Sequence, residues 1–244
     1  MFRQPIPDVT KNLLIINGLF FLATMVFESR GFNLYEYLAA FYPESPYFHP
    51  WQILTHMFMH GDITHLAFNM FALWMFGSVV ETSIGAKKFL ILYFLAGLGS
   101  FGLFNFVNYL QVENLKPLAL ELGFRLTDFT ETAVPIGHTY GEGAPQVARD
   151  LMAYYTMPMV GASGAIYGIL VAFGVLYPNA KLMMLFFPVP IKAKYFIPIM
   201  VVFEFLLGLQ NYASDPIAHF AHLGGAIIGF ILVRYWKKNY FRQF

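Results

Sequence analysis

Long apolar segments are the feature that most restricts the folds available to this chain. Of its 244 residues, 58% are hydrophobic and only 12% are charged, whereas soluble domains usually carry about 25% charged residues. Several segments are long enough for a helix to cross the hydrocarbon core of a bilayer, which needs about 20 residues. The sequence therefore predicts a polytopic membrane protein surrounded by the lipid bilayer, and not a soluble domain with an apolar core.

Six apolar segments are expected to be membrane-spanning helices, so the predicted fold class is an all-α membrane protein with a six-transmembrane-helix bundle. They lie at about residues 12–27, 63–82, 89–109, 165–177, 196–209 and 217–235. Residues 1–244 are expected to form a single membrane domain with a long polar insert at about residues 110–158, between the third and fourth helices. Within the insert, residues 116–122 are expected to form a short helix, with Pro117 in its first turn. Pro188 and Pro190 prevent residues 181–194 from continuing a helix.

Lysine and arginine are distributed unevenly between the two ends of the predicted spans. One side carries Arg3, Lys11, Lys87, Lys88, Lys181, Lys192, Lys194, Arg234, Lys237, Lys238 and Arg242, and the other carries Arg30, Lys116, Arg125 and Arg149. Cytoplasmic loops of membrane proteins carry an excess of these residues. We therefore expect both termini to be cytoplasmic, in the inner (plasma) membrane of the cell.

The fourth span is short and follows a serine flanked by glycines. Ser163 lies between Gly161 and Gly164, and the apolar run that begins at Ala165 ends before Pro178. A helix of about 13 residues is about 20 Å long, whereas the hydrocarbon core is about 30 Å thick. Ser163 is therefore expected to lie below the membrane surface, where polar groups are energetically expensive and usually functional.

Polar side chains on two other spans are expected at a similar depth. His65 and Asn69 have i, i+4 spacing, which places them on one helix face near the outer end of the second span. His222 follows Asp215 by about seven residues, which corresponds to roughly 10 Å of helix. A hydroxyl, an imidazole and a His/Asn pair at one level are the groups that nucleophilic acyl transfer requires.

The chemistry of these groups suggests their roles. The Ser163 hydroxyl needs a base, and His222 is suited to accept its proton near neutral pH. Tyr167, one turn after Ser163, could hold the His222 ring by stacking. The side chains of Asn69 and His65, together with the Ser163 N–H at a helix N-terminus, could donate to a developing oxyanion. No acidic residue is expected at the depth of His222, so the sequence predicts a Ser–His dyad.

These residues resemble the motifs of the rhomboid intramembrane serine proteases of the bacterial type. The motifs are Gly161-Ala162-Ser163-Gly164, His65 with Asn69, His60 ahead of His65, His222 followed by Gly225 and Gly229, the Gly77–Glu81–Gly85 end of the second span, and residues 187–192. The similarity covers about residues 50–235. It implies cleavage of transmembrane-helix substrates near the outer side of the membrane. Ser163 would be the nucleophile, His222 the base, and His65, Asn69 and the Ser163 amide the oxyanion donors.

Two further features follow from this resemblance. It implies that a segment at about residues 210–218 gates substrate entry. The chain also departs from the family, because Gln52 follows Trp51 where members often carry an arginine. That departure puts the usual hydrogen bonds of this loop in question.

Several histidines have simpler interpretations. His65 and Asn69 could bond loop carbonyls, and His60 is expected to hold a loop by a hydrogen bond. The short spacing of His56, His60 and His65 could also suit a metal ion. No HExxH pattern accompanies these histidines, so we expect no metal site and no cofactor.

Two glutamates are expected to be structural. Glu81, near the end of the second span, is expected to accept hydrogen bonds that hold the adjacent loop. Glu204, inside the fifth span, has no obvious charged partner in the sequence. It is expected to be a protonated carboxyl bonded to a neighbouring helix, with a part in gating as the alternative.

Other function classes fit the sequence less well. A catalytically silent rhomboid-like protein that binds membrane clients would typically lack the serine or the histidine, and this chain has both. A small-solute transporter should show paired broken helices and internal symmetry, and neither is visible. A net charge of +1 argues against a nucleic-acid partner, and the absence of cysteine excludes thiol chemistry. Transmembrane protein substrates are the expected partners.

Overall fold

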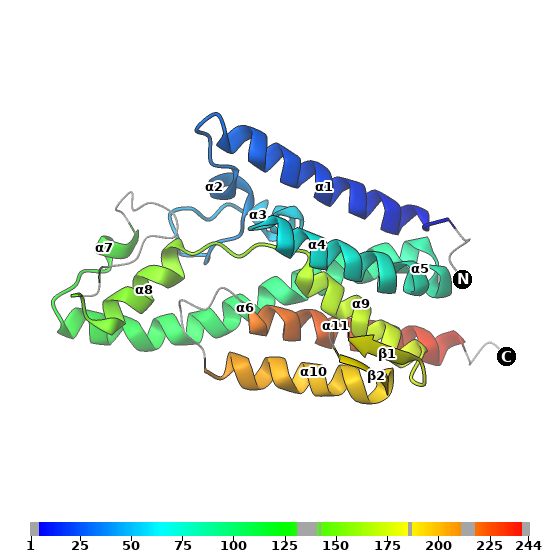
Figure 1. Ribbon diagram of the computed structural model, residues 1–244. Helices are drawn as coiled ribbons and strands as arrows, with labels where there is room; N and C mark the ends of the chain where they lie inside the picture. Colours follow the sequence, from blue (N-terminus) through cyan, green and yellow to red (C-terminus); the bar gives the residue numbers. More distant parts are fainter. Residues whose placement is uncertain (1–4, 131–140, 142, 185–186, 211–217, 241–244) are drawn as a thin grey trace.

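The computed structural model describes residues 5–130, 141, 143–184, 187–210 and 218–240 and is mainly helical (Figure 1). The long elements are α1 (Asp8–Glu28), α4 (Ile63–Ala72), α5 (Ser78–Ile84), α6 (Ala86–Glu121), α8 (Gln146–Thr156), α9 (Ser163–Leu176), α10 (Ala193–Gly208) and α11 (His219–Tyr240). The short ones are α2 (Leu34–Leu38), α3 (Gln52–Thr55), a 3-10 turn (His56–Phe58), a π-helical turn (Leu73–Gly77), α7 (Thr127–Thr130) and an antiparallel hairpin of β1 (Lys181–Met184) and β2 (Phe187–Lys192). The all-α membrane fold expected from the sequence is confirmed.

Three of the described helices are long and apolar enough to cross a membrane. They are α1, the continuous helix Ile63–Ile84 formed by α4, the π-helical turn and α5, and α6. The apolar helix α9 has 14 residues, about 21 Å at 1.5 Å per residue, and is too short to cross alone. The number of spans therefore stays a prediction, while the short fourth helix is observed.

Helix α9 lies at the centre of the bundle. It packs against α4, α5, α6, α10 and α11, and all its residues from Gly164 to Phe173 except Tyr167 are buried. Its apolar side chains join one core with residues of the other helices, for example through the edge-to-face contact of Phe173 with Phe76, whose ring centroids are 5.1 Å apart. The residue at the start of α9, Ser163, is thus held by a rigid element.

Glycines bring the backbones of α9 and α11 into direct contact. A Cβ atom on Gly225 would lie 1.8 Å from the carbonyl oxygen of Gly164, and one on Gly229 would lie 2.3 Å from that of Gly168. Small residues allow such close approach between membrane helices. Because Gly164 follows Ser163 and Gly225 lies one turn beyond His222, this contact sets the separation of the two helices at the level of those side chains.

Helix α6 is longer than the sequence analysis predicts. It has 36 residues, about 54 Å, and continues past the expected end near residue 109 to Glu121. The prediction of a separate helix at residues 116–122 with Pro117 in its first turn is wrong, because Pro117 lies inside α6. The extension is stabilised by tertiary packing, since α7 and α8 cover it (Figure 1) and bury Val112 and Ala119 in a second apolar cluster. Part of the insert, residues 131–140 and 142, lies outside the described residues.

The side chain of Glu81 holds the beginning of α1. Its carboxylate accepts hydrogen bonds from the backbone N–H groups of Val9 and Thr10, at 3.0 and 2.7 Å, and from the Thr10 hydroxyl at 2.7 Å. These N–H groups lie in the first turn of a helix, where they have no partner within the helix. The expectation that Glu81 accepts structural hydrogen bonds is confirmed, but it anchors α1 and not the adjacent loop.

Gln52, which stands where family members often carry an arginine, forms hydrogen bonds that hold its loop together. The side chain is fully buried, and its Nε2 donates to the backbone carbonyls of Glu36 and Tyr47 at 3.1 and 2.9 Å. Its Oε1 accepts from the N–H of His49 at 2.9 Å. A neutral amide therefore ties together the connection between α2 and α3.

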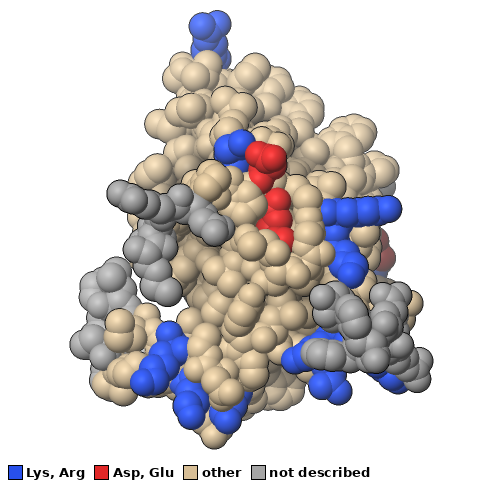
Figure 2. All heavy atoms as spheres, turned by 90° about the vertical axis from the view of Figure 1, so that its right-hand side faces the viewer, with Lys and Arg blue, Asp and Glu red and all other residues tan. Residues whose placement is uncertain are grey.

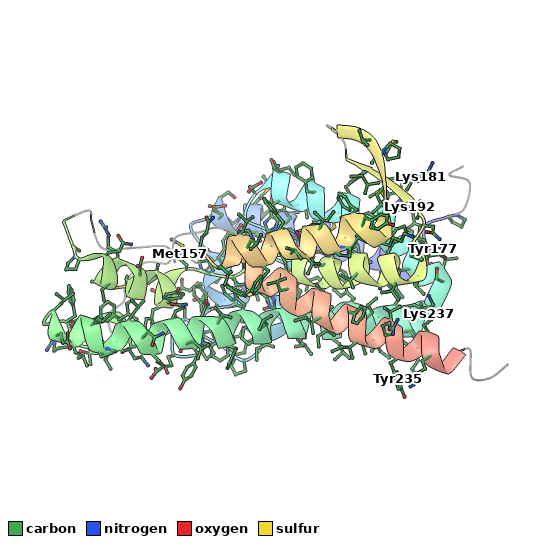
Figure 3. All side chains as sticks on the ribbon, turned by 90° about the horizontal axis from the view of Figure 1, so that it is seen from below. Met157, Tyr177, Lys181, Lys192, Tyr235 and Lys237 are labelled. Carbon is green, nitrogen blue, oxygen red and sulfur yellow. The ribbon has the colours of Figure 1, made fainter. Side chains whose placement is uncertain are left out.

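Basic residues gather at one end of the bundle. Helix α1 begins and α11 ends there (Figure 1), and Figure 2, which views this end directly, shows Lys and Arg side chains spread over it. Lys181, Lys192 and Lys237 lie toward this end in Figure 3, and Met157 lies toward the other. Lys237 donates to the carbonyl of Val175 in the last turn of α9 at 3.1 Å, where a cation stabilises the helix dipole.

Candidate active site

Ser163 and His222 meet across the contact between α9 and α11. The Ser163 Oγ lies 2.9 Å from the His222 Nε2. Ser163 is the first residue of α9 and His222 lies one turn into α11, so two different helices supply the pair. Both side chains are partly buried and line one cavity. This geometry allows the imidazole to accept the serine proton.

Tyr167 fixes the orientation of the His222 ring. The two rings are stacked with centroids 4.2 Å apart and an interplanar angle of 3°. Tyr167 lies one turn after Ser163 on the same helix, so the helix that carries the hydroxyl also carries the ring that supports its partner. The stacking expected from the sequence is present.

The expectation that no acidic residue reaches His222 is wrong. The Oε2 of Glu204, on α10, lies 3.0 Å from the Nδ1 of His222 and 2.6 Å from the Nδ1 of His219. Its Oε1 accepts a hydrogen bond from the Tyr167 hydroxyl. Glu204 is 8% exposed, so a buried carboxyl group contacts the side of the imidazole that faces away from Ser163.

His65 and Asn69 lie against the backbone that leads into Ser163. Gly161 has a φ of +119°, a conformation that favours glycine. A Cβ atom there would be 2.8 Å from the His65 Nε2 and 3.6 Å from the Asn69 Nδ2. Helix α4 holds the pair at this level because the Asp62 carboxylate caps it, accepting from the His65 N–H at 2.8 Å.

The Asn69 amide has an unused donor. Asn69 is 7% exposed, and its Nδ2 has no hydrogen-bond partner within the described part of the chain. Buried polar groups are nearly always paired in folded proteins. Asn69 also lines the cavity that contains Ser163, so its side chain lies beside any group bound there.

The cavity has a volume of about 710 Å³. Residues of α4, α9, α10 and α11 contribute to its wall. Helices α6 and α8 contribute as well, through residues that include Asn105, Asn108 and Tyr154. Ligand pockets are typically of this size and combine apolar walls with a few polar groups. An imidazole beside a serine hydroxyl is a pair that can carry out acyl transfer to serine.

Comparison with known proteins identifies the family. A model of the rhomboid domain matches residues 47–238 of the chain. The chain belongs to the rhomboid family. It is similar to an uncharacterized mitochondrial rhomboid protein of Schizosaccharomyces pombe, with 28% identity over 209 residues that cover 78% of this chain and 52% of the relative.

Other rhomboid relatives include two named proteins. Rhomboid protein 1, mitochondrial, of Saccharomyces cerevisiae is 27% identical over 191 residues, covering 78% of this chain and 43% of the relative. Rhomboid protease AarA of Providencia stuartii is 27% identical over 234 residues, covering 92% of this chain and 70% of the relative. The chain thus spans about half the length of the two mitochondrial relatives.

His60 lies behind the cavity wall of this rhomboid. Its ring packs edge-on against His65, with centroids 5.1 Å apart and an interplanar angle of 67°, and its backbone carbonyl accepts a hydrogen bond from the Tyr35 hydroxyl at 2.7 Å. Burial lowers the pKa of His60 to about 4, so the ring is neutral at physiological pH. His60 therefore supports the position of His65 without lining the cavity.

One group of side chains has the spacing of metal ligands. Within the described residues, Glu204, His219 and His222 present ligand atoms within 4.8 Å of one another, whereas His56, His60 and His65 do not form such a group. The separations of 2.6 and 3.0 Å between the Glu204 Oε2 and the two imidazole nitrogens are those of hydrogen bonds. Hydrogen bonds of the Glu204 carboxyl group to both imidazoles account for this grouping.

The sequence analysis did not name His219, and it expected Glu204 to bond to a neighbouring helix, as observed, but not to His222. His219 precedes His222 by three residues, so both lie on one face of α11. Glu204 lies four residues before the end of α10, and His222 lies three residues after the start of α11. The end of α10 and the start of α11 are close in the sequence. This closeness was the signal that could have placed Glu204 and His222 at one depth. The gating segment expected at about residues 210–218 lies mostly outside the described residues.

Proposed function

We propose that this rhomboid is an intramembrane serine endopeptidase that cleaves transmembrane-helix substrates near the outer side of the membrane. The observation that carries the proposal is the 2.9 Å separation of the Ser163 Oγ and the His222 Nε2, in a cavity at the start of a short, buried helix. The family includes a relative named as a protease, AarA of Providencia stuartii. Transmembrane proteins are the proposed partners, and the chemistry requires no cofactor.

The reaction follows from the positions of the groups. The Ser163 hydroxyl gives its proton to the His222 Nε2 as its oxygen attacks the scissile carbonyl carbon. The tetrahedral intermediate then expels the amine, which receives the proton from His222. A water molecule attacks the resulting acyl-enzyme, again giving a proton to His222, and releases the carboxylic acid and free Ser163.

Three groups are proposed to stabilise the oxyanion. The Ser163 N–H lies in the first turn of α9, where backbone N–H groups have no partner within the helix and the helix dipole is positive. The Asn69 Nδ2 has an unused donor in the same cavity. His65 lies beside it against Gly161. Donors placed before the reaction stabilise the charge that develops in the transition state.

The cavity favours an unwound segment of substrate. An intact helix with its side chains is about 10 Å wide, whereas a cavity of 710 Å³ is of the size that holds a drug-sized ligand. We therefore propose that substrates carry residues that weaken a helix, such as Gly, Pro or β-branched residues, near the scissile bond.

The distribution of charge supports an orientation in the membrane. Lysine and arginine gather at the end of the bundle where α1 begins and α11 ends (Figures 1 and 2), and such clusters face the cytoplasm. We propose that both termini are cytoplasmic, in the inner (plasma) membrane, and that residues 1–244 form one membrane domain. Met157, which lines the cavity, lies toward the opposite end (Figure 3), so the cavity faces the outer side.

The proposed function is tested by cleavage of a model transmembrane substrate in proteoliposomes. We expect labelling by a fluorophosphonate probe, cleavage that is insensitive to EDTA, and product masses that place the cut toward the outer end of the substrate helix. A cut at the cytoplasmic end would contradict the orientation. Substrate binding with neither labelling nor cleavage would instead support the catalytically silent rhomboid-like protein.

Replacing Asn69 with alanine should lower kcat by about 10- to 1000-fold, because one oxyanion donor is lost. KM should change little if the donor acts mainly in the transition state. The matched control is Asn17→Ala, which removes another buried asparagine, on α1, whose Nδ2 is bonded to the Leu13 carbonyl at 2.7 Å. An unchanged kcat in the Asn69 variant would assign this side chain to loop support alone.

A further inference from the structure

Glu204 presents a buried carboxyl group to three donors. Its Oε2 lies within hydrogen-bond distance of His219 and His222, both at Nδ1, and its Oε1 accepts from the Tyr167 hydroxyl. Helix α10 buries four residues, namely Ala193, Ile197, Glu204 and Gly208, and Glu204 is the one with a titratable side chain. Burying a carboxylate is costly unless hydrogen bonds compensate for lost hydration, and this set of contacts supplies them.

The contacts determine which nitrogen of His222 carries the proton. An ionised carboxylate can only accept hydrogen bonds, so a neutral imidazole facing it must carry its hydrogen at Nδ1. The other nitrogen of His222, Nε2, then has a free lone pair, and it is this atom that lies 2.9 Å from the Ser163 Oγ. The Glu204 carboxylate thus favours the one neutral tautomer that can accept the serine proton.

We propose that Glu204 is a positioning residue that holds His222 in this tautomer and stabilises the imidazolium formed during the reaction, so that the site operates as Ser163–His222–Glu204. The inference rests on the proposed function and deepens it. It replaces the Ser–His dyad expected from the sequence with a three-residue arrangement assembled from α9, α11 and α10.

The proton balance is simple. When the Ser163 oxygen bonds to the substrate carbonyl carbon, the O–H bond breaks and its proton moves to the His222 Nε2. The hydrogen at Nδ1 stays on the ring, and the Glu204 carboxylate stays ionised and compensates the imidazolium charge. The proton at Nε2 then passes to the leaving amine, so His222 and Glu204 end the step as they began it.

The other contacts of Glu204 maintain the carboxylate in place. The Tyr167 hydroxyl bonds to one oxygen while the Tyr167 ring stacks on His222 at 4.2 Å. His219, one turn before His222 on α11, bonds to the other oxygen at 2.6 Å. The carboxylate is therefore fixed with respect to the imidazole by residues of both neighbouring helices.

The test compares the full-length wild-type protein with Glu204→Gln, which keeps the shape of the side chain and removes its charge. Histidine-selective 15N NMR, with His222 assigned by its own substitution, reports the tautomer in the absence of substrate. Steady-state cleavage of the model substrate reports kcat and KM. The matched control is Glu121→Gln, the same chemical change at an exposed position at the end of α6.

We expect the wild type and Glu121→Gln to show His222 protonated at Nδ1. We expect Glu204→Gln to lose that preference, because the glutamine amide can donate to Nδ1, with kcat lowered by about 10²- to 10⁴-fold and KM nearly unchanged. If the Gln variant does not fold, Glu204→Asp is measured in the same way, since it keeps the charge and shortens the side chain by one methylene group. An unchanged tautomer or an unchanged kcat in folded Glu204→Gln overturns the proposal, as does an unchanged kcat in Glu204→Asp, whose shorter side chain withdraws the carboxylate from the His222 Nδ1.

The two readouts separate this inference from the proposed function. A wild-type protein without cleavage activity would contradict the protease, whereas the NMR measurement would still show whether Glu204 sets the His222 tautomer. An active wild type whose Glu204→Gln variant cleaves at the same rate would contradict only the role of Glu204.

Discussion

Replacing Ser163 with alanine abolishes fluorophosphonate labelling and cleavage of a model transmembrane substrate if this hydroxyl is the nucleophile. The expected loss is at least about 10⁴-fold, because removing the nucleophile of a serine protease leaves only the catalysis that arises from binding and the oxyanion donors. The fold should be retained, since alanine is smaller than serine and Ser163 is the first residue of α9. Labelling is followed by in-gel fluorescence and cleavage by mass spectrometry.

The chain offers a close control for this experiment. Ser100, on α6, is 1% exposed, and its Oγ would be 2.0 Å from a Cβ atom on Gly164, the residue that follows Ser163. Ser100→Ala therefore removes a second buried hydroxyl next to α9 and should leave labelling and cleavage intact. Persistent activity in the Ser163 variant would remove this residue from the mechanism, and equal losses in both variants would indicate a packing effect.

Replacing Gly225 with alanine should destabilise the protein by about 3 kcal/mol or more. A Cβ atom at this position would lie 1.8 Å from the carbonyl oxygen of Gly164, and a backbone carbonyl cannot move aside as a flexible side chain can. Helix α11 must therefore shift away from α9, and overpacking of this kind usually costs about 1–3 kcal/mol even where side chains can adjust. Thermal unfolding in detergent measures the loss.

The control for the glycine substitution is Gly18→Ala. Gly18 lies inside α1, and a Cβ atom there would meet nothing within 4 Å. Because alanine favours helix by about 1 kcal/mol relative to glycine, this variant should be as stable as the wild type or more stable. Unchanged stability of the Gly225 variant would contradict the direct backbone contact between α9 and α11.

The features that the sequence predicted well are those set by local patterns. The start of α9 follows from its short apolar run and the glycines around Ser163, and the shared face of His65 and Asn69 follows from helical spacing. These inferences depend on residues near one another in the chain, so no knowledge of the tertiary fold was needed.

The features that were missed depend on contacts between distant segments. Hydropathy indicates where a helix leaves the bilayer but not where the helix ends, and α6 continues because α7 and α8 cover its extension. The depth of His222 was measured from Asp215, whereas its acidic partner Glu204 lies on another helix. The side-by-side arrangement of α10 and α11 brings the carboxyl group and the imidazole to one level.

The location of Glu204 on α10 has a consequence for the timing of proteolysis. Buried residues of α10 form a single stripe that includes Glu204, while Ile199, Val202 and Phe203 are exposed on its surface. If this helix swings outward to admit a client, it withdraws the carboxylate from His222 and leaves the imidazole unaligned. The site would then be inactive while α10 is displaced, and it would become active only after α10 has returned to its position around the substrate.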